Sequence, residues 1–326
     1  MNSTVAATFI QAACAPLLIG MNALDIERCW EKVYYQTYKQ GVMGIQPESL
    51  SGIDIALWDI LGRATGMPIH QLLGGKRRDS VRMYSSIGGG SRNTPAQMAK
   101  FAEEAVQDGF TAVKIRMDYG PNPPDADVKH DLEVLKTVRN AIGPDIELKY
   151  DPNNGYSVQT AIRVGRDIEA FHVNHYEEPV AQTDYRGLAE VVRAVDIPVA
   201  AGEHEYTRWQ FRDLIEQANP DILQPDVVKC AGLTEAIKIA ALGSSHHKIL
   251  VPHQTQPTIG QAATLHFVSV FTAGDTPQEI SHNGMKSELH SLFKDPLEFR
   301  NGRLTVPAGP GLGLELDEKR LERMKV

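Results

Sequence analysis

The sequence predicts an α/β protein built around a closed barrel of parallel strands, and two observations support this fold class. Between residues 80 and 283, short apolar runs rich in β-branched residues alternate with amphipathic stretches of helical period. Eight such runs over about 200 residues favour a barrel over an open sheet. In addition, nearly every run ends in an ionisable residue. An open doubly wound sheet is the alternative, but the run Gly88–Gly90 lacks the GxGxxG spacing that usually follows its first strand.

The composition is that of an ordinary globular protein and limits its partners. The chain has 326 residues, of which 42% are hydrophobic and 23% charged. Its net charge of −8, without a basic run, disfavours nucleic-acid binding. The apolar runs fall short of the roughly 18 residues that a membrane span needs. The three cysteines form no CxxC pair, which indicates a reducing compartment, the cytoplasm, and argues against a disulfide framework or a thiolate zinc site.

The first 79 residues are predicted to be mostly helical. Hydrophobic periodicity predicts one helix over 25–38 and a stronger one over 51–64, which Gly66 and Pro68 stop. The apolar stretch Val5–Ile19 loosely resembles the apolar region of a signal peptide. Because it lacks a cationic flank and contains a proline, we predict that it belongs to the folded domain.

The predicted barrel occupies residues 80–283. Its strands are expected at 81–84, 112–116, 146–151, 173–177, 197–203, 222–226, 249–253 and 278–281. Helices are expected between them, among others at 95–107, 127–141, 158–171, 208–218, 233–242 and 260–271. From about residue 284 the alternation is lost, and a Gly/Pro-rich turn follows at 307–313. We expect residues 284–326 to leave the barrel and to pack back on residues 1–79.

Ionisable residues close the predicted strands at regular intervals along the chain. They are Lys114 and Arg116, then Asp151, Glu177, Glu203, Asp226, His253 and Glu279. From Asp151 onward the separations are 26, 26, 23, 27 and 26 residues, about one βα unit each. Any one of these acids alone is better explained as a helix cap or a surface ion pair. Because capping needs no such regularity, the series indicates one shared site at the C-terminal rim of the barrel.

The residue types suggest how such a site works. Asp151, Glu177 and Glu203 supply hard oxygen ligands that suit Mg²⁺, whereas a single in-phase histidine makes zinc a poor fit. A carboxylate next to a histidine fixes its tautomer and raises its basicity, so Asp226 and His253 suit general acid–base catalysis. Two further side chains, Lys114 and Arg116, share one face of their strand and are expected to neutralise an anionic substrate.

Short motifs surround these residues. They are GIDIALWDILGRATGMPIHQLLGG at 52–75, the KxR pair Lys114/Arg116, DPN with Asp151 and Asn153, EEP with Glu177, GEH with Glu203, QPDVVKCAG with Asp226, VPH with His253, and Glu279. In these motifs, across almost its whole length, the sequence resembles the mandelate racemase subgroup of the enolase superfamily. The resemblance implies a (β/α)₇β barrel with a capping domain, here a partial α+β domain formed by 1–79 and completed by about 284–326. Enolase-superfamily sites use a lysine or histidine base together with Mg²⁺.

The resemblance also implies roles for individual residues. Mg²⁺ would be held by Asp151, Glu177 and Glu203, and His253 with Asp226 would form a catalytic dyad. Glu279 would hydrogen-bond the substrate on its carboxylate side. Two further residues, Asn153 and His204, are candidates for substrate contact or for support of their neighbours. For His204, a polar loop position without a role in binding is an equal alternative.

Two departures from the family pattern bear on activity. Arg116 stands where the family usually has a second lysine, and a guanidinium stays protonated near neutral pH, so it is a poor base and a good anion partner. Family members also begin with a few strands and a mobile loop that covers the barrel mouth, ahead of the helix that starts near Asp25. We expect this chain to lack that lid, which normally excludes water and selects the substrate.

The site residues and the family resemblance together lead us to expect a Mg²⁺-dependent dehydratase of acid sugars (aldonates or aldarates). It would remove the proton α to a carboxylate and eliminate the β-hydroxyl as water, giving a 2-keto-3-deoxy sugar acid. One alternative is a racemase, epimerase or cycloisomerase of the same family, and another is a catalytically silent paralogue without a lid. The expected partner is a small carboxylate, with no nucleic acid and no membrane, and we expect a homo-oligomer.

Overall fold

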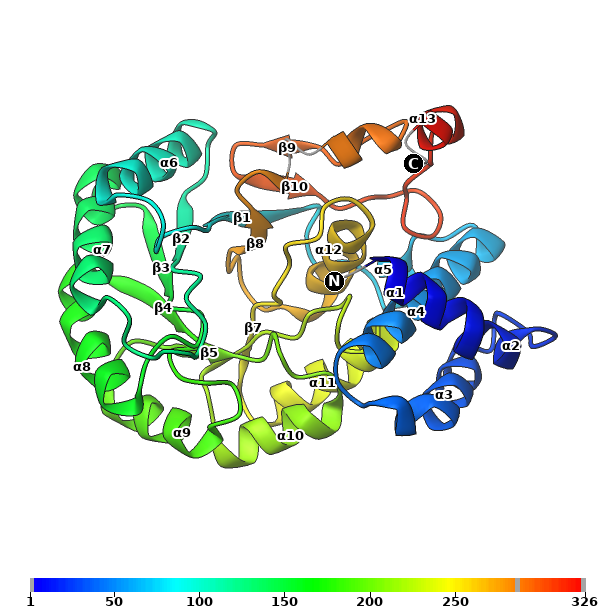
Figure 1. Ribbon diagram of the computed structural model, residues 1–326. Helices are drawn as coiled ribbons and strands as arrows, with labels where there is room; N and C mark the ends of the chain where they lie inside the picture. The colour runs from blue at the N-terminus through cyan, green and yellow to red at the C-terminus, as the bar shows by residue number, and fades with distance from the viewer. Residues whose placement is uncertain (1–2, 285–287, 324–326) are drawn as a thin grey trace.

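A computed structural model describes residues 3–284 and 288–323 of the chain. Figure 1 shows α6 to α10 as an arc around one side of the strands, with α1 to α4 gathered beside α11 and α12. The barrel strands are β1 (Ser80–Ile87), β2 (Ala112–Arg116), β3 (Glu147–Asp151), β4 (Val173–Glu177), β5 (Val199–Ala201), β6 (Ile222–Leu223), β7 (Ile249–Leu250) and β8 (Gln278–Ser281). The helices between them are α6 (Pro95–Gln107), α7 (Val128–Ile142), α8 (Val158–Ile168, followed by η3, Glu169–Phe171), α9 (Tyr185–Ala194), α10 (Arg208–Gln217), α11 (Leu233–Ser245) and α12 (Ile259–Phe271).

The strands form the predicted (β/α)₇β barrel. Parallel pairing runs from β1 through β7 in chain order, and β8 returns to pair with β1, so that Tyr84 lies opposite Glu279. Seven helices connect the eight strands, and the apolar side chains between strands and helices form the main core. The C-terminal ends of all eight strands therefore meet at one rim.

Three predicted strands end earlier than the sequence suggests. β5, β6 and β7 stop at Ala201, Leu223 and Leu250, two or three residues before the polar residues that were expected to close them. Gly202 turns the chain away with a φ of 131°, and prolines at positions 225 and 252 have no backbone N–H to donate to a neighbouring strand. Three of the candidate site residues consequently lie on the loops just beyond the strands.

The N-terminal region is helical, as expected. Its elements are α1 (Ser3–Phe9), a π-helical turn η1 (Ile10–Cys14), α2 (Ala15–Leu18), α3 (Ile26–Thr37), η2 (Tyr38–Gln40), α4 (Ile45–Thr65) and α5 (Ile69–Leu72). The predicted helix over 51–64 is the later part of α4, which starts six residues earlier. The earlier start of α4 includes Pro47, which usually disfavours a helix. In the first turn a proline is tolerated, because the N–H that it lacks would have no intrahelical partner.

The N-terminal helices hold the beginning of α11. Trp30 on α3 donates its indole N–H to the carbonyl of Ala231 at 2.8 Å. From α4, the carboxylate of Asp54 accepts the backbone N–H of Thr234 at 2.9 Å, and the indole N–H of Trp58 reaches the Thr234 hydroxyl at 2.9 Å. These contacts fix α4 against a barrel helix through buried hydrogen bonds.

The C-terminal segment makes contacts with two parts of the molecule. Its elements are η5 (Glu288–Leu292), β9 (Phe299–Arg300), β10 (Arg303–Thr305) and α13 (Glu318–Arg323). The β9–β10 hairpin, which the sequence analysis did not anticipate, extends the start of β1 in antiparallel pairing. Further on, Gly311 accepts a hydrogen bond from the backbone of Ile69 at 2.9 Å, and Leu314 accepts one from Arg63 at 2.8 Å. The division into a capping domain and a barrel at residues 79 and 284 stays a prediction.

Within the described residues, the structure contains no helix with the length and apolar character needed to cross a membrane. The three cysteines, Cys14, Cys29 and Cys230, are free and buried.

Candidate active site

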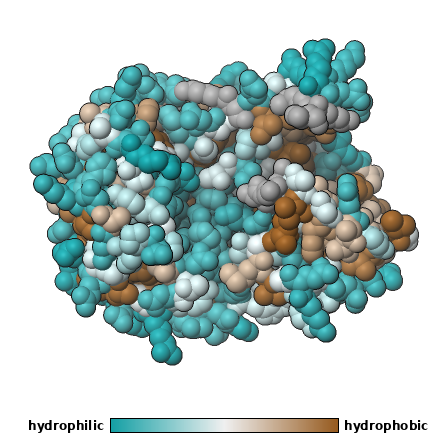
Figure 2. All heavy atoms as spheres, viewed as in Figure 1, coloured by the Kyte–Doolittle hydropathy of each residue, from teal (hydrophilic) through white to brown (hydrophobic). Residues whose placement is uncertain are grey.

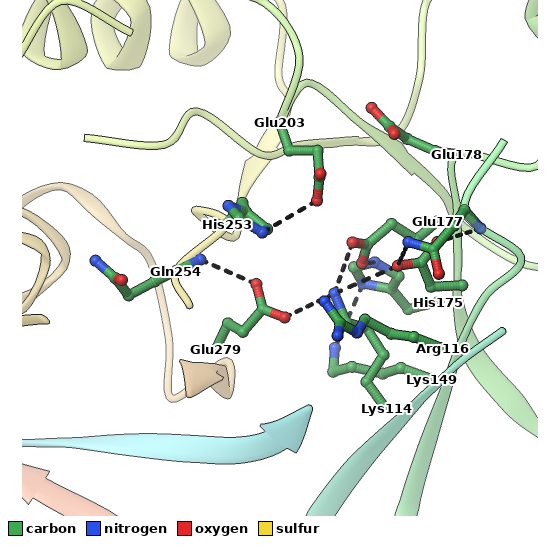
Figure 3. Close-up of polar contacts among 12 residues, drawn as sticks. Lys114, Arg116, Lys149, His175, Glu177, Glu178, Glu203, His253, Gln254 and Glu279 are labelled. Carbon is green, nitrogen blue, oxygen red and sulfur yellow. Dashed lines mark hydrogen bonds and ion pairs between the residues drawn. The ribbon is translucent and has the colours of Figure 1, made fainter. Parts of the chain in front are cut away.

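The candidate residues meet at the mouth of the barrel. Inward-facing residues of β2, β3, β4 and β8 supply Lys114, Asp151, Glu177 and Glu279, and the loops after β5, β6 and β7 supply Glu203, Asp226 and His253. Figure 3 shows the side chains of Lys114, Glu177, Glu203, His253 and Glu279 pointing toward one another. All of these side chains are at least 87% buried.

Lys114 is the central cation of the site. Its ammonium lies 2.6 Å from Glu177 Oε1, 2.8 Å from Glu279 Oε1 and 4.0 Å from Asp151 Oδ2. Burial alone would lower the pKa of Lys114, but the carboxylates of Glu177 and Glu279 outweigh it and hold the pKa well above its usual range. Lys114 therefore stays charged and balances part of the negative charge at the mouth.

Asp151 is oriented by the residue two positions after it. The backbone N–H and the side-chain amide of Asn153 donate to the two oxygens of Asp151 at 2.7 and 2.9 Å. The amide oxygen of Asn153 accepts the backbone N–H of Asp118 at 2.8 Å. Asn153, predicted as a substrate contact or a support for its neighbours, is here bonded to the carboxylate that it would support.

His253 forms the predicted pair with Asp226. Its Nδ1 lies 2.7 Å from Asp226 Oδ2, and its Nε2 lies 3.2 Å from Glu203 Oε2. Burial alone would lower the pKa of His253, but the carboxylates of Glu203 and Glu279, with the hydrogen bond to Asp226, raise it to about 9. In this state the imidazole is protonated at neutral pH and donates to a carboxylate on each side.

Arg116 is held at the edge of the site. Its guanidinium lies 3.6 Å from Asp118, and it stays charged because nearby carboxylates, Asp118 first, raise its pKa against the effect of burial. Gly88 leaves room for this placement, since a Cβ there would lie 2.5 Å from Nη2 of Arg116. The side chain can therefore attract an anion but is a poor base.

His204 borders a cavity beside the acidic cluster. Its Nδ1 lies 2.9 Å from Glu178 Oε2 and its Nε2 lies 3.5 Å from Glu203 Oε1. The cavity of about 580 Å³ is also lined by Tyr119 and Asn153. His204 is thus close enough to meet a ligand at the mouth, although its ring is already bound to two carboxylates.

The carboxylates of the site suit a divalent cation. Burial and the neighbouring charges of Glu177 and Glu203 hold the pKa of Asp151 well above its usual range, even with Lys114 nearby. A hard cation between these oxygens would relieve the repulsion, and carboxylate oxygens are the ligands that Mg²⁺ prefers. Among the described residues, one group of three has its ligand atoms within 4.8 Å of one another, namely Glu178, Glu203 and His204. The predicted set of Asp151, Glu177 and Glu203 does not lie as close together and shares only Glu203 with this group.

The sequence analysis missed a second layer of polar residues beneath the rim. Lys149 and His175 precede Asp151 and Glu177 by two residues, and both are buried in the barrel. Burial lowers the pKa of Lys149 to about 8, and burial together with the charge of Lys149 lowers the pKa of His175 to about 4. The alternation of strand residues was the pattern that could have identified them, since it places both on the inner face.

Comparison with known proteins places this site in a family. The Enolase C-terminal domain-like family model matches residues 97–320, and the model of the mandelate racemase/muconate lactonizing enzyme N-terminal domain matches residues 2–74. The chain belongs to the mandelate racemase/muconate lactonizing enzyme family of the enolase superfamily. The family assignment from the sequence motifs is thereby confirmed, and the chain is an enolase-superfamily enzyme.

Relatives of this enolase-superfamily chain are named for reactions of acid sugars. It is 36% identical to D-galactarolactone cycloisomerase of Agrobacterium fabrum, over 95% of this chain and 82% of that protein. It is 32% identical to arabinonate dehydratase of Saccharolobus solfataricus, over 97% and 82% of the two chains. A mandelate racemase/muconate lactonizing protein of Paracoccus denitrificans, solved in complex with magnesium, superposes with a TM-score of 0.93 at 35% identity, covering 98% of this chain and 86% of that one.

Proposed function

We propose that this enzyme catalyses the Mg²⁺-dependent dehydration of an acid sugar, with His253 as its base. The observation that carries the proposal is the asymmetry of the site. His253 is paired with Asp226 at 2.7 Å and faces the carboxylates, whereas Arg116 is held by Asp118 and stays charged. One base facing the mouth suits removal of a proton from one face of the substrate.

Asp151, Glu177 and Glu203 are the residues that would hold Mg²⁺. When bound, the ion supplies positive charge that stabilises the negative charge developing on the substrate carboxylate. Lys114 supplies a second positive charge at the same place. Its contacts with Glu177 and Glu279 hold the ammonium at the mouth, where an incoming carboxylate meets it.

Neutralisation of the acidic cluster prepares His253 to act as a base. The high pKa of its imidazole depends on the free carboxylates of Glu203 and Glu279. When their charges are compensated, the pKa of His253 falls toward neutrality, and the neutral imidazole can take the α-proton. Asp226 keeps the acceptor nitrogen, Nε2, turned toward the mouth.

His253 alone can carry out both proton transfers of the elimination. His253 takes the α-proton as the C–H bond breaks, and the protonated imidazole then gives a proton to the β-hydroxyl as the C–O bond breaks and water leaves. The enol that remains tautomerises to the 2-keto-3-deoxy acid. Glu279 accepts the backbone N–H of Gln254 at 2.9 Å in the present state. Lys114 and His253 outweigh burial and hold the pKa of Glu279 below its usual range. A substrate carboxylate placed beside Glu279 would act in the opposite direction and favour a protonated Glu279 that donates to that carboxylate.

Cycloisomerisation is the second candidate, because the relative that is 36% identical is named as a cycloisomerase. The same base serves both reactions if the oxygen that leaves belongs to a lactone ring and stays in the molecule. Racemisation fits the site less well, since exchange on two faces needs a second base and Arg116 is a poor one.

A screen of aldonates, aldarates and their lactones, with and without Mg²⁺, tests the proposal. We expect Mg²⁺-dependent formation of a 2-keto acid with loss of the mass of one water. A product of unchanged mass from a lactone would favour the cycloisomerase, and interconversion of C2 epimers without water loss would contradict both. No turnover of any acid by a folded, Mg²⁺-binding chain would favour the silent paralogue.

A further inference from the structure

Two buried residues lie directly beneath the proposed metal site. Lys149 on β3 and His175 on β4 are register partners in the parallel sheet, and each lies two residues before a candidate metal ligand. Their side chains are 3% and 0% exposed. Because side chains two apart on a strand share a face, both point into the barrel one layer below the rim.

The contacts of His175 fix which of its nitrogens carries the proton. Its Nδ1 lies 3.5 Å from the Lys149 ammonium, and its Nε2 lies 2.9 Å from Glu177 Oε2. An ammonium group has only donors and a carboxylate only acceptors. A neutral His175 therefore satisfies both neighbours in one tautomer, with Nδ1 accepting from Lys149 and Nε2–H donating to Glu177.

This arrangement determines the orientation of Glu177. One oxygen of its carboxylate, Oε1, contacts Lys114 at 2.6 Å, and the other, Oε2, contacts His175. The opposite tautomer would turn a lone pair of His175 toward Oε2 and repel it. The ring of Tyr84 lies 4.9 Å from the Lys149 ammonium and helps to keep this charge in the core.

We propose that Lys149 is a positioning residue: by donating to Nδ1 it secures the Nε2–H tautomer of His175, which Glu177 also favours, and this imidazole in turn orients the Glu177 carboxylate for metal binding. The proposal rests on the proposed function in one respect, since it takes Glu177 as a Mg²⁺ ligand. In other metal sites, mutating a residue that orients a metal ligand typically lowers the metal affinity by about ten- to a hundredfold. If Lys149 had only a structural role, it would stabilise the barrel without affecting the tautomer of His175 or the affinity for Mg²⁺.

The tautomer is measured directly by nitrogen NMR on protein labelled with ¹⁵N-histidine, without metal or substrate. The signals of His175 are assigned by their loss in His175→Gln. We expect wild-type His175 to be neutral, with Nε2 protonated and Nδ1 bare, and Lys149→Met to populate the Nδ1–H form. A wild-type His175 protonated at Nδ1, or a tautomer unchanged by Lys149→Met, would overturn the proposal. This measurement stands whether or not the chain dehydrates an acid sugar.

A double-mutant cycle tests the consequence for the metal. Leu at position 175 neither accepts from Lys149 nor donates to Glu177, so it removes the link between the two residues. We expect Lys149→Met to weaken Mg²⁺ binding in calorimetry by about tenfold, and to lower kcat at limiting Mg²⁺ with recovery at high Mg²⁺. In the His175→Leu background the same change should alter Mg²⁺ binding less than twofold. Equal losses in both backgrounds would show that Lys149 acts independently of His175 and would contradict the proposal.

The matched control is Lys100→Met, which removes a lysine whose side chain is 72% exposed on α6. It should leave Mg²⁺ binding and the His175 signals unchanged. Circular dichroism of each variant checks the fold, and Lys149→Leu, which also removes the ammonium, replaces Lys149→Met if the latter does not fold.

Discussion

At the scale of single residues, buried charge determines what the mouth of the barrel can do. Lys114 contacts two carboxylates within 2.8 Å, yet the pKa of Asp151 is still held well above its usual range. Burial, together with the charges of Glu177 and Glu203, therefore outweighs the lysine at Asp151. The uncompensated charge is the physical reason why the site suits a divalent cation, and the position of Glu203 between His253 and His204 makes it the most informative ligand to change.

We expect Glu203→Gln to weaken Mg²⁺ binding by at least tenfold while the fold is retained. The amide has the shape of the carboxylate but not its charge, and loss of a charged ligand removes a large part of the attraction for the ion. Isothermal calorimetry measures the affinity, and thermal unfolding checks the fold. The control is Glu133→Gln on the exposed face of α7. Unchanged Mg²⁺ affinity in Glu203→Gln would refute its assignment as a ligand.

At the scale of elements, each βα unit after the first brings one or two functional groups to the rim, and the turn after the strand determines how they point. The residues on β2, β3, β4 and β8 are placed by the sheet itself. Those after β5, β6 and β7 are placed by short turns that begin with a glycine or contain a proline. The loop after β1 has a different task, because Gly88 provides the space into which Arg116 folds.

We expect Gly88→Ala to lower kcat/KM by about tenfold with little loss of stability. A Cβ at this position would lie 2.5 Å from Arg116 Nη2 and 3.0 Å from Asp118 Oδ2, so the guanidinium must move away. Little stability is lost because the clash involves the flexible end of a side chain. Steady-state kinetics and thermal unfolding measure the two effects. Gly52→Ala, where a Cβ meets nothing within 4 Å, is the control, and equal kinetics in the two variants would show that the position of Arg116 is unimportant.

The sequence was sufficient to predict the barrel, because eight runs of β-branched residues at one βα spacing leave few alternatives. It was also sufficient to predict that Asp226 and His253 pair, since the structure places them 2.7 Å apart. Their position beyond the strands was missed, because the apolar pattern continues past the point at which the backbone leaves the sheet. Lys149 and His175 were missed for the opposite reason, since polar residues inside an apolar strand look like exceptions until the barrel brings them together.

At the scale of the whole molecule, the surface is hydrophilic at the mouth of the barrel and more apolar over the N-terminal helices. Figure 2 shows hydrophilic residues lining the hollow at the centre and more hydrophobic ones over the region of α1 to α3. Val5, Ile19 and Tyr35 in this region are 49%, 82% and 51% exposed. A homo-oligomer and a cytoplasmic location stay predictions, and light scattering would measure the former. The N-terminal helices are bound to the barrel at Asp54, which links the stability of the whole chain to pH.

We expect Asp54 to make the protein less stable as pH rises from 5 to 8. Burial raises the pKa of Asp54 to about 7, although hydrogen bonds from Thr234 oppose the shift. The folded state therefore prefers the protonated acid, and its contribution is lost as pH rises from the unfolded pKa near 4 through about 7. The cost at pH 8 is up to about 4 kcal/mol. Urea unfolding of wild type and Asp54→Asn across this range should show wild type losing stability relative to the variant, and parallel curves would contradict the assignment.

The central claim, that His253 is the single base, is tested most directly by proton exchange in D₂O. NMR follows solvent deuterium entering the position α to the carboxylate of recovered substrate, or C3 of the keto product, with wild type and His253→Asn at saturating Mg²⁺. We predict incorporation by wild type, and loss of both exchange and dehydration in a folded, Mg²⁺-binding His253→Asn, at a cost of several kcal/mol, about 10²–10⁴-fold in rate. Exchange by His253→Asn at the wild-type rate would show that another group is the base and would contradict the account.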